Sequence, residues 1–371
     1  MRILVGSNHL AQTGGTESYT FALATALKEL GHEVEYFTFN KGLVSDQLER
    51  YGIPFMAHEY YDLILANHTP VIEYLFSYGL IIQTCHGTIP DLEQPSPYAD
   101  MYISISEEIK AHLQHLDIES DVMLNGIDCE RFTPHAPIHS KLTRVLSLCQ
   151  SDVANNFIQE CCNAVSDGQI EFISCNKFTD NVWEIEEKIN QADLVVGIGR
   201  SLYDAMACGR CVISYDYRPY HNAAVGDGYL TERNIQQSIA YNCSGRGTNR
   251  TFTKDEFIAE LKKYNPEDGK WTRRYALENL NMRKSAERYI EYYNKYKIPE
   301  IGLRKLMIIK TLSTQKETAM TNRITALEGE LLRVSKKREK YLRILRLITY
   351  ITLSLIIIIT TICIYHFSAK G

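Results

Sequence analysis

The stretch ADLVVGIGRSLYDAMACGRCVISYD spans Ala192 to Asp216 and carries the strongest structural signal of the chain. An apolar run, a glycine-rich turn, a short amphipathic segment and a second apolar run follow one another within it. This order predicts a strand, a turn, a helix, a glycine stop and a second strand. The predicted elements are, in order, Leu194–Val196, Gly197 to Gly199, Ser201–Ala207, Gly209 and Val212–Ser214.

The amino end of the predicted helix is a candidate phosphate site. The first backbone N–H groups of a helix have no partner within the helix, and the helix dipole makes this end positive. A strand, a glycine-rich turn and a helix start therefore favour an anion such as phosphate. Arg200 stands at the helix start, where a guanidinium can bind phosphate oxygens in a bidentate manner. Asp204 follows one turn later, where it can accept hydrogen bonds from sugar hydroxyls. A strand–helix–strand unit without a ligand is the alternative.

Length and composition limit the possible classes of protein. The chain has 371 residues, which suits two domains of average size. Its formal net charge of −5 argues against nucleic acid as a partner, because a nucleic-acid-binding protein shows a basic surface. The 10 cysteines have no regular spacing and are predicted to be reduced thiols. Cys208 and Cys211 form a C-x-x-C pair, but no further ligand motif completes a zinc site.

Apolar runs and amphipathic segments alternate along most of the chain. This alternation predicts βαβ units and parallel sheets with helices on their faces. The first set of runs ends near residue 135, and the pattern restarts at Arg144. The turn signal Asn125-Gly126 lies between the two sets and predicts an interdomain linker. We therefore expect an α/β protein with one Rossmann-like domain over residues 1–135 and a second over residues 136–298.

Three strings, in this order along the chain, give the sequence a family resemblance. Gly14-Gly15-Thr16-Glu17 precedes a predicted helix, N-G-I-D-x-x-R-F-x-P begins at Asn125, and Asp204 is followed by A-M-A-C-G. These strings resemble the glycine-rich first loop, the linker and the donor-binding segment of family-4-like glycosyltransferases. The resemblance covers about residues 1 to 296. It implies the GT-B fold, in which two Rossmann-like domains with parallel sheets face a cleft.

The resemblance also implies an activity. A sugar moves from a nucleotide-diphosphate donor, bound by the C-terminal domain, to an acceptor hydroxyl on the N-terminal domain. Retention of the anomeric configuration is expected, as is catalysis without a metal or a cofactor, the nucleotide sugar being a substrate. The expected acceptor is lipid-linked or another glycan, in envelope or capsular polysaccharide or glycolipid synthesis. The implied catalytic residues are His86 and Asp204. The implied donor-binding residues are Gly14, Gly15, Thr16, Arg200, Ser201 and Asp204.

Two departures from the family pattern keep other functions open. The family's donor segment usually has a glutamate eight residues before its second carboxylate, and that place is Val196 here. The family also commonly has an arginine and a lysine after the first strand of the second domain, whereas residues 149–157 contain neither. One alternative is a catalytically inactive, membrane-tethered binding or scaffold protein with the GT-B fold. A non-glycosyl GT-B enzyme such as an epimerase is another, although no catalytic carboxylate set for it is evident.

Residues 299–346 are expected to form a helical stalk. Apolar residues recur there at alternating spacings of four and three, which is typical of a coiled-coil seam. Two copies paired through the stalk as a homodimer and a single stalk packed on its own domain are both compatible with this spacing. The seam residues are Met320, Ile324, Leu327, Leu331 and Val334.

The last part of the chain predicts a membrane anchor. Leu347 to Tyr365 is a run of 19 residues without a charge, long enough to cross a hydrocarbon core of about 30 Å. We therefore expect a transmembrane helix over residues 347–366. Several lysines and arginines precede this run, and the positive-inside rule places them in the cytoplasm. The expectation is a single-pass membrane protein with cytoplasmic catalytic domains.

Overall fold

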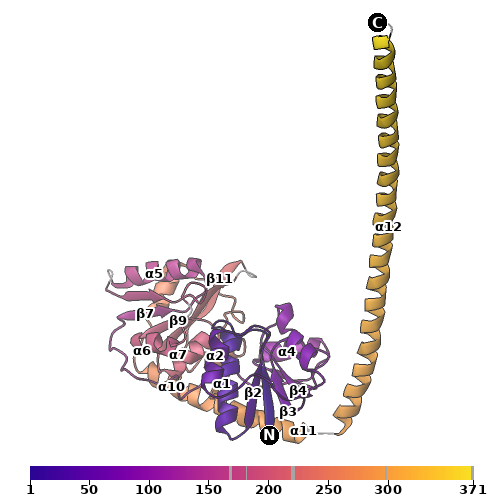
Figure 1. Ribbon diagram of the computed structural model, residues 1–371. Coiled ribbons are helices and arrows are strands. Elements are labelled where there is room, and N and C mark those ends of the chain that lie inside the picture. Colours follow the sequence, from indigo (N-terminus) through magenta and orange to yellow (C-terminus); the bar gives the residue numbers. More distant parts are fainter. Residues whose placement is uncertain (167–168, 181, 219–221, 297–298, 369–371) are drawn as a thin grey trace. The chain divides into compact units, whose positions relative to one another are not determined.

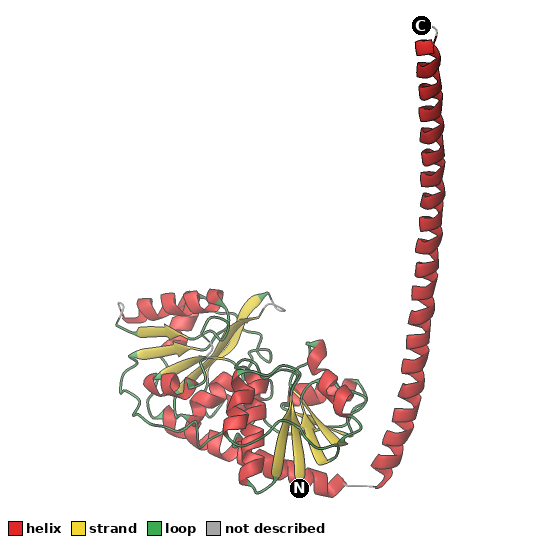
Figure 2. Ribbon diagram, in the orientation of Figure 1, coloured by secondary structure: helices red, strands yellow, loops and turns green. Residues whose placement is uncertain are grey.

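The computed structural model describes the chain except for residues 167–168, 181, 219–221, 297–298 and 369–371. The chain forms two compact units, Met1–Ile298 and Pro299–Gly371. The larger unit contains two sheets, which Figure 2 shows as separate groups of strands with helices around each. This arrangement confirms the predicted parallel-sheet α/β class.

The first sheet has six parallel strands in the order β2-β1-β3-β4-β5-β6 (Figure 1). Alternate residues of β1 face opposite sides: Ile3 and Val5 pack with α1 and α2, whereas Leu4 packs with α3. Both faces are therefore covered, as is usual for parallel sheets. The elements are β1 (Arg2–Gly6), α1 (Gly15–Glu29), β2 (Glu33–Phe37), α2 (Leu43–Arg50), β3 (Tyr61–Ala66), α3 (Thr69–Leu75), β4 (Gly79–Cys85), a 3₁₀ turn (Asp91–Glu93), β5 (Met101–Ser104), α4 (Glu107–His115) and β6 (Asp121–Val122).

The second sheet has five strands in the order β11-β10-β9-β7-β8, and only the pairing of β10 with β11 is antiparallel. Helices α6, α7 and α10 pack on one face, and α5 and α9 pack on the other. The elements are β7 (Arg144–Ser147), α5 (Asp152–Ser166), β8 (Glu171–Ser174), α6 (Ile185–Gln191), β9 (Leu194–Gly197), α7 (Arg200–Ala207), β10 (Cys211–Arg218), β11 (Ala223–Tyr229), α8 (Ile235–Ile239), α9 (Lys254–Leu261) and α10 (Asp268–Asn279).

The stretch from Ala192 to Asp216 folds as predicted, as β9, α7 and β10. Gly199 is the residue that makes the tight entry into α7 possible, because its φ of 55° and ψ of −129° are accessible to glycine alone. Cys208 and Cys211 are buried free thiols, and burial raises their pKa values to about 12 and about 11. Thiols so resistant to ionisation pack as small apolar groups.

The chain passes from the first domain to the second and later returns, and the two passages are joined by backbone hydrogen bonds. Ile127 donates its N–H to the carbonyl of Leu280 at 2.6 Å, and Met282 donates its N–H to the carbonyl of Ile127 at 2.9 Å. Ile127 and Phe132 already belong to the core of the second domain. The second domain thus begins earlier than the expected residue 136.

Helix α11 (Met282–Tyr296) returns to the first domain, although the sequence boundaries assigned it to the second. It packs against α1, and Tyr289 and Tyr293 join the core of the first sheet. The Tyr289 hydroxyl lies 2.7 Å from the hydroxyl of Tyr19 on α1 and 2.5 Å from that of Thr84 on β4. These two tyrosines therefore serve core packing.

The second unit is the single helix α12 (Pro299–Ser368) of 70 residues. Residues 299–346, which were expected to form a helical stalk, lie within this helix, and their role as a stalk stays a prediction. The seam residues Met320, Ile324, Leu327, Leu331 and Val334 are all exposed on it. Pairing of two stalks stays a prediction.

Among the described residues, no helix is both long and apolar enough to cross a membrane. The transmembrane segment expected over residues 347–366 is therefore not supported. A span needs about 20 consecutive apolar residues. Within the predicted segment, positions 354, 357–358 and 360–366 lie outside the described side chains. The cytoplasmic location stays a prediction.

The buried hydroxyl cluster gives a test of how α11 is held. Tyr289→Phe should lower the free energy of unfolding by about 1–3 kcal/mol, because the hydroxyls of Tyr19 and Thr84 lose a buried partner. Urea denaturation measures the change. Tyr60→Phe is the matched control, since Tyr60 is 63% exposed, and it should stay within about 0.5 kcal/mol of the wild type. Equal effects of the two substitutions would contradict the role given to the cluster.

Candidate functional site

Arg200 joins the two domains. It is the first residue of α7 and is 7% exposed. Its Nη1 donates to Asn125 Oδ1 at 3.2 Å and to the Gly126 carbonyl at 2.5 Å, both in the linker. Its Nη2 donates to the carbonyl of Ser18, in the first turn of α1, at 3.5 Å. The amino ends of α1 and α7 therefore meet where the domains meet, and Arg200 lies between them.

Asp204 is a buried carboxyl group on the same helix. Its Oδ1 lies 4.0 Å from Arg200 Nε, and neither atom has a hydrogen-bond partner among the described residues. Burial raises the pKa of Asp204 to about 6, although the charge of Arg200 acts in the opposite direction. Near neutral pH this carboxyl group is thus close to its titration point and poorly solvated. The structure brings Arg200 and Asp204 together, as their spacing on the helix predicts.

The glycine-rich loop before α1 lies at the carboxyl end of β1. Gly15 is exposed, and Gly14 and Thr16 are partly exposed. A Cβ at Gly14 would lie 2.1 Å from Oε2 of Glu17, so a larger residue there would displace the end of the Glu17 side chain from its present position. Glu17 is buried. Ser201, the second residue of α7, is partly buried.

His86 lies directly after β4 and is held in one orientation. Its Nε2 is 3.2 Å from Asn67 Oδ1, and the amide of Asn67 donates to Thr20 at 3.0 Å. The proton of His86 therefore lies on Nε2, which faces an acceptor. Burial lowers its pKa to about 3, and the nearby charge of Arg200 contributes. His86 is a neutral imidazole beside Arg200.

Two further charged residues, which the sequence interpretation did not single out, belong to this region. His9, in the loop after β1, lies with its Nε2 2.6 Å from Glu17 Oε1. Lys177 follows β8 in the second domain, and its charge acts on both His9 and Glu17. Both lie three positions after the last residue of a strand, and the carboxyl ends of parallel strands are where such folds bind ligands. Their position shortly after a predicted strand was the sequence signal that could have identified these two residues.

Loops at the carboxyl ends of the second sheet hold Lys177 in place. Gln150, after β7, accepts the Lys177 backbone N–H on its Oε1 at 2.9 Å. The Gln150 carbonyl accepts from the Asn176 side chain at 3.3 Å. Gln150 lies in the segment where the family commonly places cations. The positive charge at the carboxyl edge of the second sheet comes instead from Lys177, in the loop after β8.

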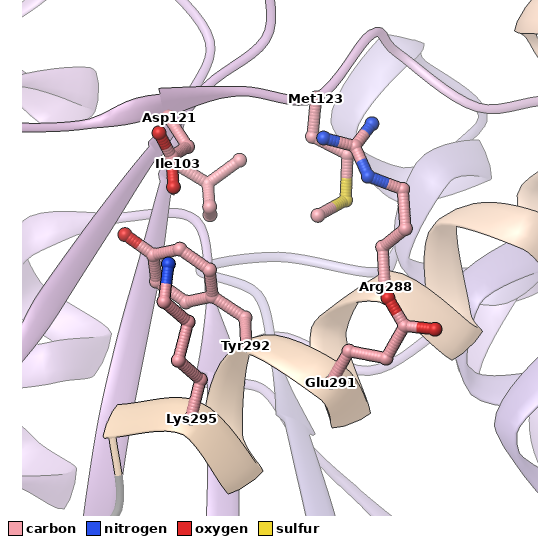
Figure 3. Close-up of a pocket in the computed structure, with 7 residues that line it drawn as sticks. All are labelled: Ile103, Asp121, Met123, Arg288, Glu291, Tyr292 and Lys295. Atoms are coloured by element: carbon pink, nitrogen blue, oxygen red, sulfur yellow. The ribbon is translucent and has the colours of Figure 1, made fainter.

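Two other features lie apart from this region. Figure 3 shows a pocket of about 150 Å³ between α11 and the strands β5 and β6. Side chains of Asp121, Arg288, Glu291 and Lys295 line it, together with apolar and aromatic groups. None of the predicted site residues is among the lining residues.

The second feature is a group on the edge strand β2. The side-chain ligand atoms of Glu33, Glu35 and His58 lie within 4.8 Å of one another. His58 Nδ1 is 2.7 Å from Glu35 Oε1, while Glu35 Oε2 accepts the Ala57 N–H at 2.8 Å and the Tyr61 hydroxyl. Ion pairing and hydrogen bonding within the protein account for this group.

Comparison with known proteins identifies the fold. The sequence matches no protein-family model and no curated protein. A crystal structure of HepE from Anabaena in complex with UDP-glucose covers 79% of this chain and 99% of its own, at 12% identity and a TM-score of 0.52. A second HepE structure, with UDP and glucose, covers 78% and 99%, at 12% identity and a TM-score of 0.54. The two-domain, parallel-sheet α/β fold matches that of GT-B glycosyltransferases, as the sequence predicts.

The raised pKa of Asp204 predicts a pH-dependent stability. Its folded-state pKa of about 6 exceeds the ordinary value of 3.8, so its contribution to stability is fully present below pH 4 and is lost as the pH rises through 6. Asp204→Asn does not titrate. The variant's free energy of unfolding relative to the wild type should therefore increase between pH 4 and pH 8, by on the order of 3 kcal/mol.

Denaturation at several pH values measures this difference. Asp255→Asn serves as the control, because Asp255 is an exposed carboxylate of the same domain. The control should show no comparable change over the same range. A difference between Asp204→Asn and the wild type that stays constant with pH would contradict the burial argument.

Proposed function

We propose that this protein is a glycosyltransferase that moves a sugar from a nucleotide-diphosphate donor to an acceptor hydroxyl where its two domains meet. The observation that carries the proposal is the meeting of the amino ends of α1 and α7, with Arg200 between them. Two helix amino ends and a guanidinium form a positive region suited to a diphosphate. The fold supports the same assignment, because HepE, with the same architecture, has been solved with UDP-glucose.

The donor diphosphate is proposed to bind at this positive region. The backbone of Gly14, Gly15 and Thr16 approaches it from the first domain, while Arg200 and Ser201 approach from the second. Lys177 adds a cation from the loop after β8. Negative charge builds on the departing diphosphate during transfer, and fixed positive groups stabilise that charge more in the transition state than in the ground state.

Asp204 is proposed to bind a hydroxyl group of the donor. Its Oδ1 has no hydrogen-bond partner among the described residues, so it is able to accept one from a sugar or ribose hydroxyl. A hydroxyl donor would also relieve the cost of burying this carboxylate, which its raised pKa reflects.

His86 is proposed to orient substrate rather than to accept a proton. Its Nε2 faces Asn67, and burial holds it in the neutral form. A neutral, fixed imidazole is suited to a hydrogen bond with a sugar hydroxyl. Retention of configuration, independence of metals and cofactors, and a lipid-linked or glycan acceptor stay predictions.

One observation favours the alternative of an inactive binding or scaffold protein. The Nη atoms of Arg200 already donate to Asn125, Gly126 and Ser18, so the guanidinium serves the domain junction. A phosphate would have to share this cation with the protein. Binding and turnover of donors therefore decide between the two functions.

Donor binding tests the proposal. Isothermal titration of the full chain with UDP, GDP and UDP-glucose should detect binding of at least one of them. Lys177→Ala should weaken that binding by about 10- to 100-fold, because a hydrogen bond to a charged group contributes about 1.5–3 kcal/mol. Lys177 is preferable to Arg200 for this test, since Arg200 also holds the linker.

Lys262→Ala is the matched control, because Lys262 is an exposed lysine of the same domain, and it should bind like the wild type. Absence of binding by the folded wild type to every nucleotide tested would contradict the proposal. Binding without hydrolysis or transfer from any nucleotide sugar would favour the inactive alternative.

A further inference from the structure

Two half-exposed aromatic rings lie side by side on the first domain. Tyr74 of α3 is 51% exposed, and Phe39, two residues after the end of β2, is 46% exposed. Their ring centroids are 5.7 Å apart, with an interplanar angle of 78°. The buried ring of Phe37 contacts both, because it stacks on Tyr74 at 4.9 Å and meets Phe39 edge to face at 5.1 Å. We call Phe39 and Tyr74 the aromatic patch.

The rings of the aromatic patch are held in place by their neighbours. Phe37 belongs to a core cluster of the first sheet, and Tyr78, just before β4, stacks on Tyr74 at 6.3 Å. The backbone N–H of Phe39 donates to the carbonyl of Asn8 at 3.2 Å. Side chains that are already ordered lose little conformational entropy when a ligand binds. The patch is therefore a preformed surface for a ligand with an apolar face.

The aromatic patch adjoins the candidate site. Leu10 donates its N–H to the carbonyl of Asn40 at 2.8 Å, which joins the loop after β1 to the loop after β2. His68, the residue before α3, accepts the Asn8 N–H on its Nδ1 at 3.1 Å. Both elements that carry the patch are thus hydrogen-bonded to the loop that holds His9. A chain-like ligand with one end at this loop would reach the patch next.

We infer that the aromatic patch binds sugar residues of an extended glycan acceptor, beyond the residue that receives the transferred sugar. This inference rests on the proposed glycosyl transfer and deepens it, because it makes the acceptor a saccharide chain. A pyranose ring has an apolar face of C–H groups that packs on an aromatic ring, while hydroxyl groups at its rim form hydrogen bonds. The hydroxyl group of Tyr74 can donate to one of these or accept from it.

The size and the surroundings of the aromatic patch fit a sugar chain better than a protein partner. A specific protein interface buries about 800 Å² on each partner, whereas two half-exposed rings offer roughly 200 Å² between them. Exposed polar residues border the rings: Asn40 and Lys41 follow Phe39, and Glu73 precedes Tyr74. Their amide, ammonium and carboxylate groups can form hydrogen bonds with sugar hydroxyls. The patch thus combines apolar ring faces with polar groups, as a saccharide does.

Glycan binding in the absence of a donor tests the inference. Maltoheptaose, cellohexaose and chitohexaose are titrated into the full chain by calorimetry, each beside its monosaccharide. At least one chain should bind about 10-fold or more tightly than its monosaccharide, because several sugar residues then contact the protein. Tyr74→Ala and Phe39→Ala should each weaken this binding by about 3- to 10-fold through loss of a ring contact, whereas Tyr74→Trp should retain it. Tyr60→Ala is the matched control, since Tyr60 is a 63% exposed tyrosine of the same domain outside the patch.

Donor binding separates this inference from the proposed function. UDP should bind equally to the wild type, Tyr74→Ala and Phe39→Ala, and transfer to the bound chain should show a raised KM for the acceptor with an unchanged kcat in both variants. A wild type that binds a saccharide chain through these rings but binds no nucleotide would contradict the proposed function and keep the patch as a glycan site. Equal affinity of both variants and the wild type for every chain would overturn the inference. Absence of binding to all three chains would overturn it too, as would binding of phospholipid vesicles in their place.

Discussion

The paired crossing of the chain between the domains is the constraint on which the rest of the larger unit depends. Ile127 bonds to both Leu280 and Met282 through its backbone, so the outgoing and returning passages lie side by side. Because the return passage is fixed there, α11 is directed onto the first sheet, where Tyr289 closes the core beside α1. The same junction brings the start of α1 to the start of α7. The position of the candidate site thus follows from these backbone hydrogen bonds together with the side-chain hydrogen bonds of Arg200.

Arg200 places a positive charge in this junction. The protein groups that contact the guanidinium are neutral oxygens, which offset the cost of burying this charge only in part. Two carbonyl oxygens and one amide oxygen accept its hydrogen bonds. The carboxylate of Asp204 stays 4.0 Å away, too far for a hydrogen bond. Burial therefore raises the pKa of Asp204 despite the cation. A ligand hydroxyl within reach of both groups could donate to the carboxylate and accept from the guanidinium, which is why donor recognition is proposed at this junction.

The parts of this architecture that local chemistry determines were predictable from the sequence. The glycines around α7 and the apolar run of β9 mark these two elements within one residue, whereas β10 continues four residues beyond its predicted end at Ser214. The placement of α11 was not predictable, because its tyrosines indicate that it packs but not against which sheet. The nearness of Lys177 to His9 was not predictable either, since the two belong to different domains and meet only in the folded chain.

The histidines show why residue type alone does not identify a catalytic group. His86 follows a strand in the position that the family resemblance favours, yet burial and Arg200 keep it neutral. His9 follows another strand and lies in no family string, but a buried carboxylate reaches its ring. Both side chains are imidazoles, so the difference comes from the dielectric surroundings and the partner of each ring. Gly14 leaves room for that partner, because a Cβ there would displace the end of the Glu17 side chain from its present position. A glycine expected to bind phosphate therefore also adjoins the carboxylate that contacts a neighbouring imidazole.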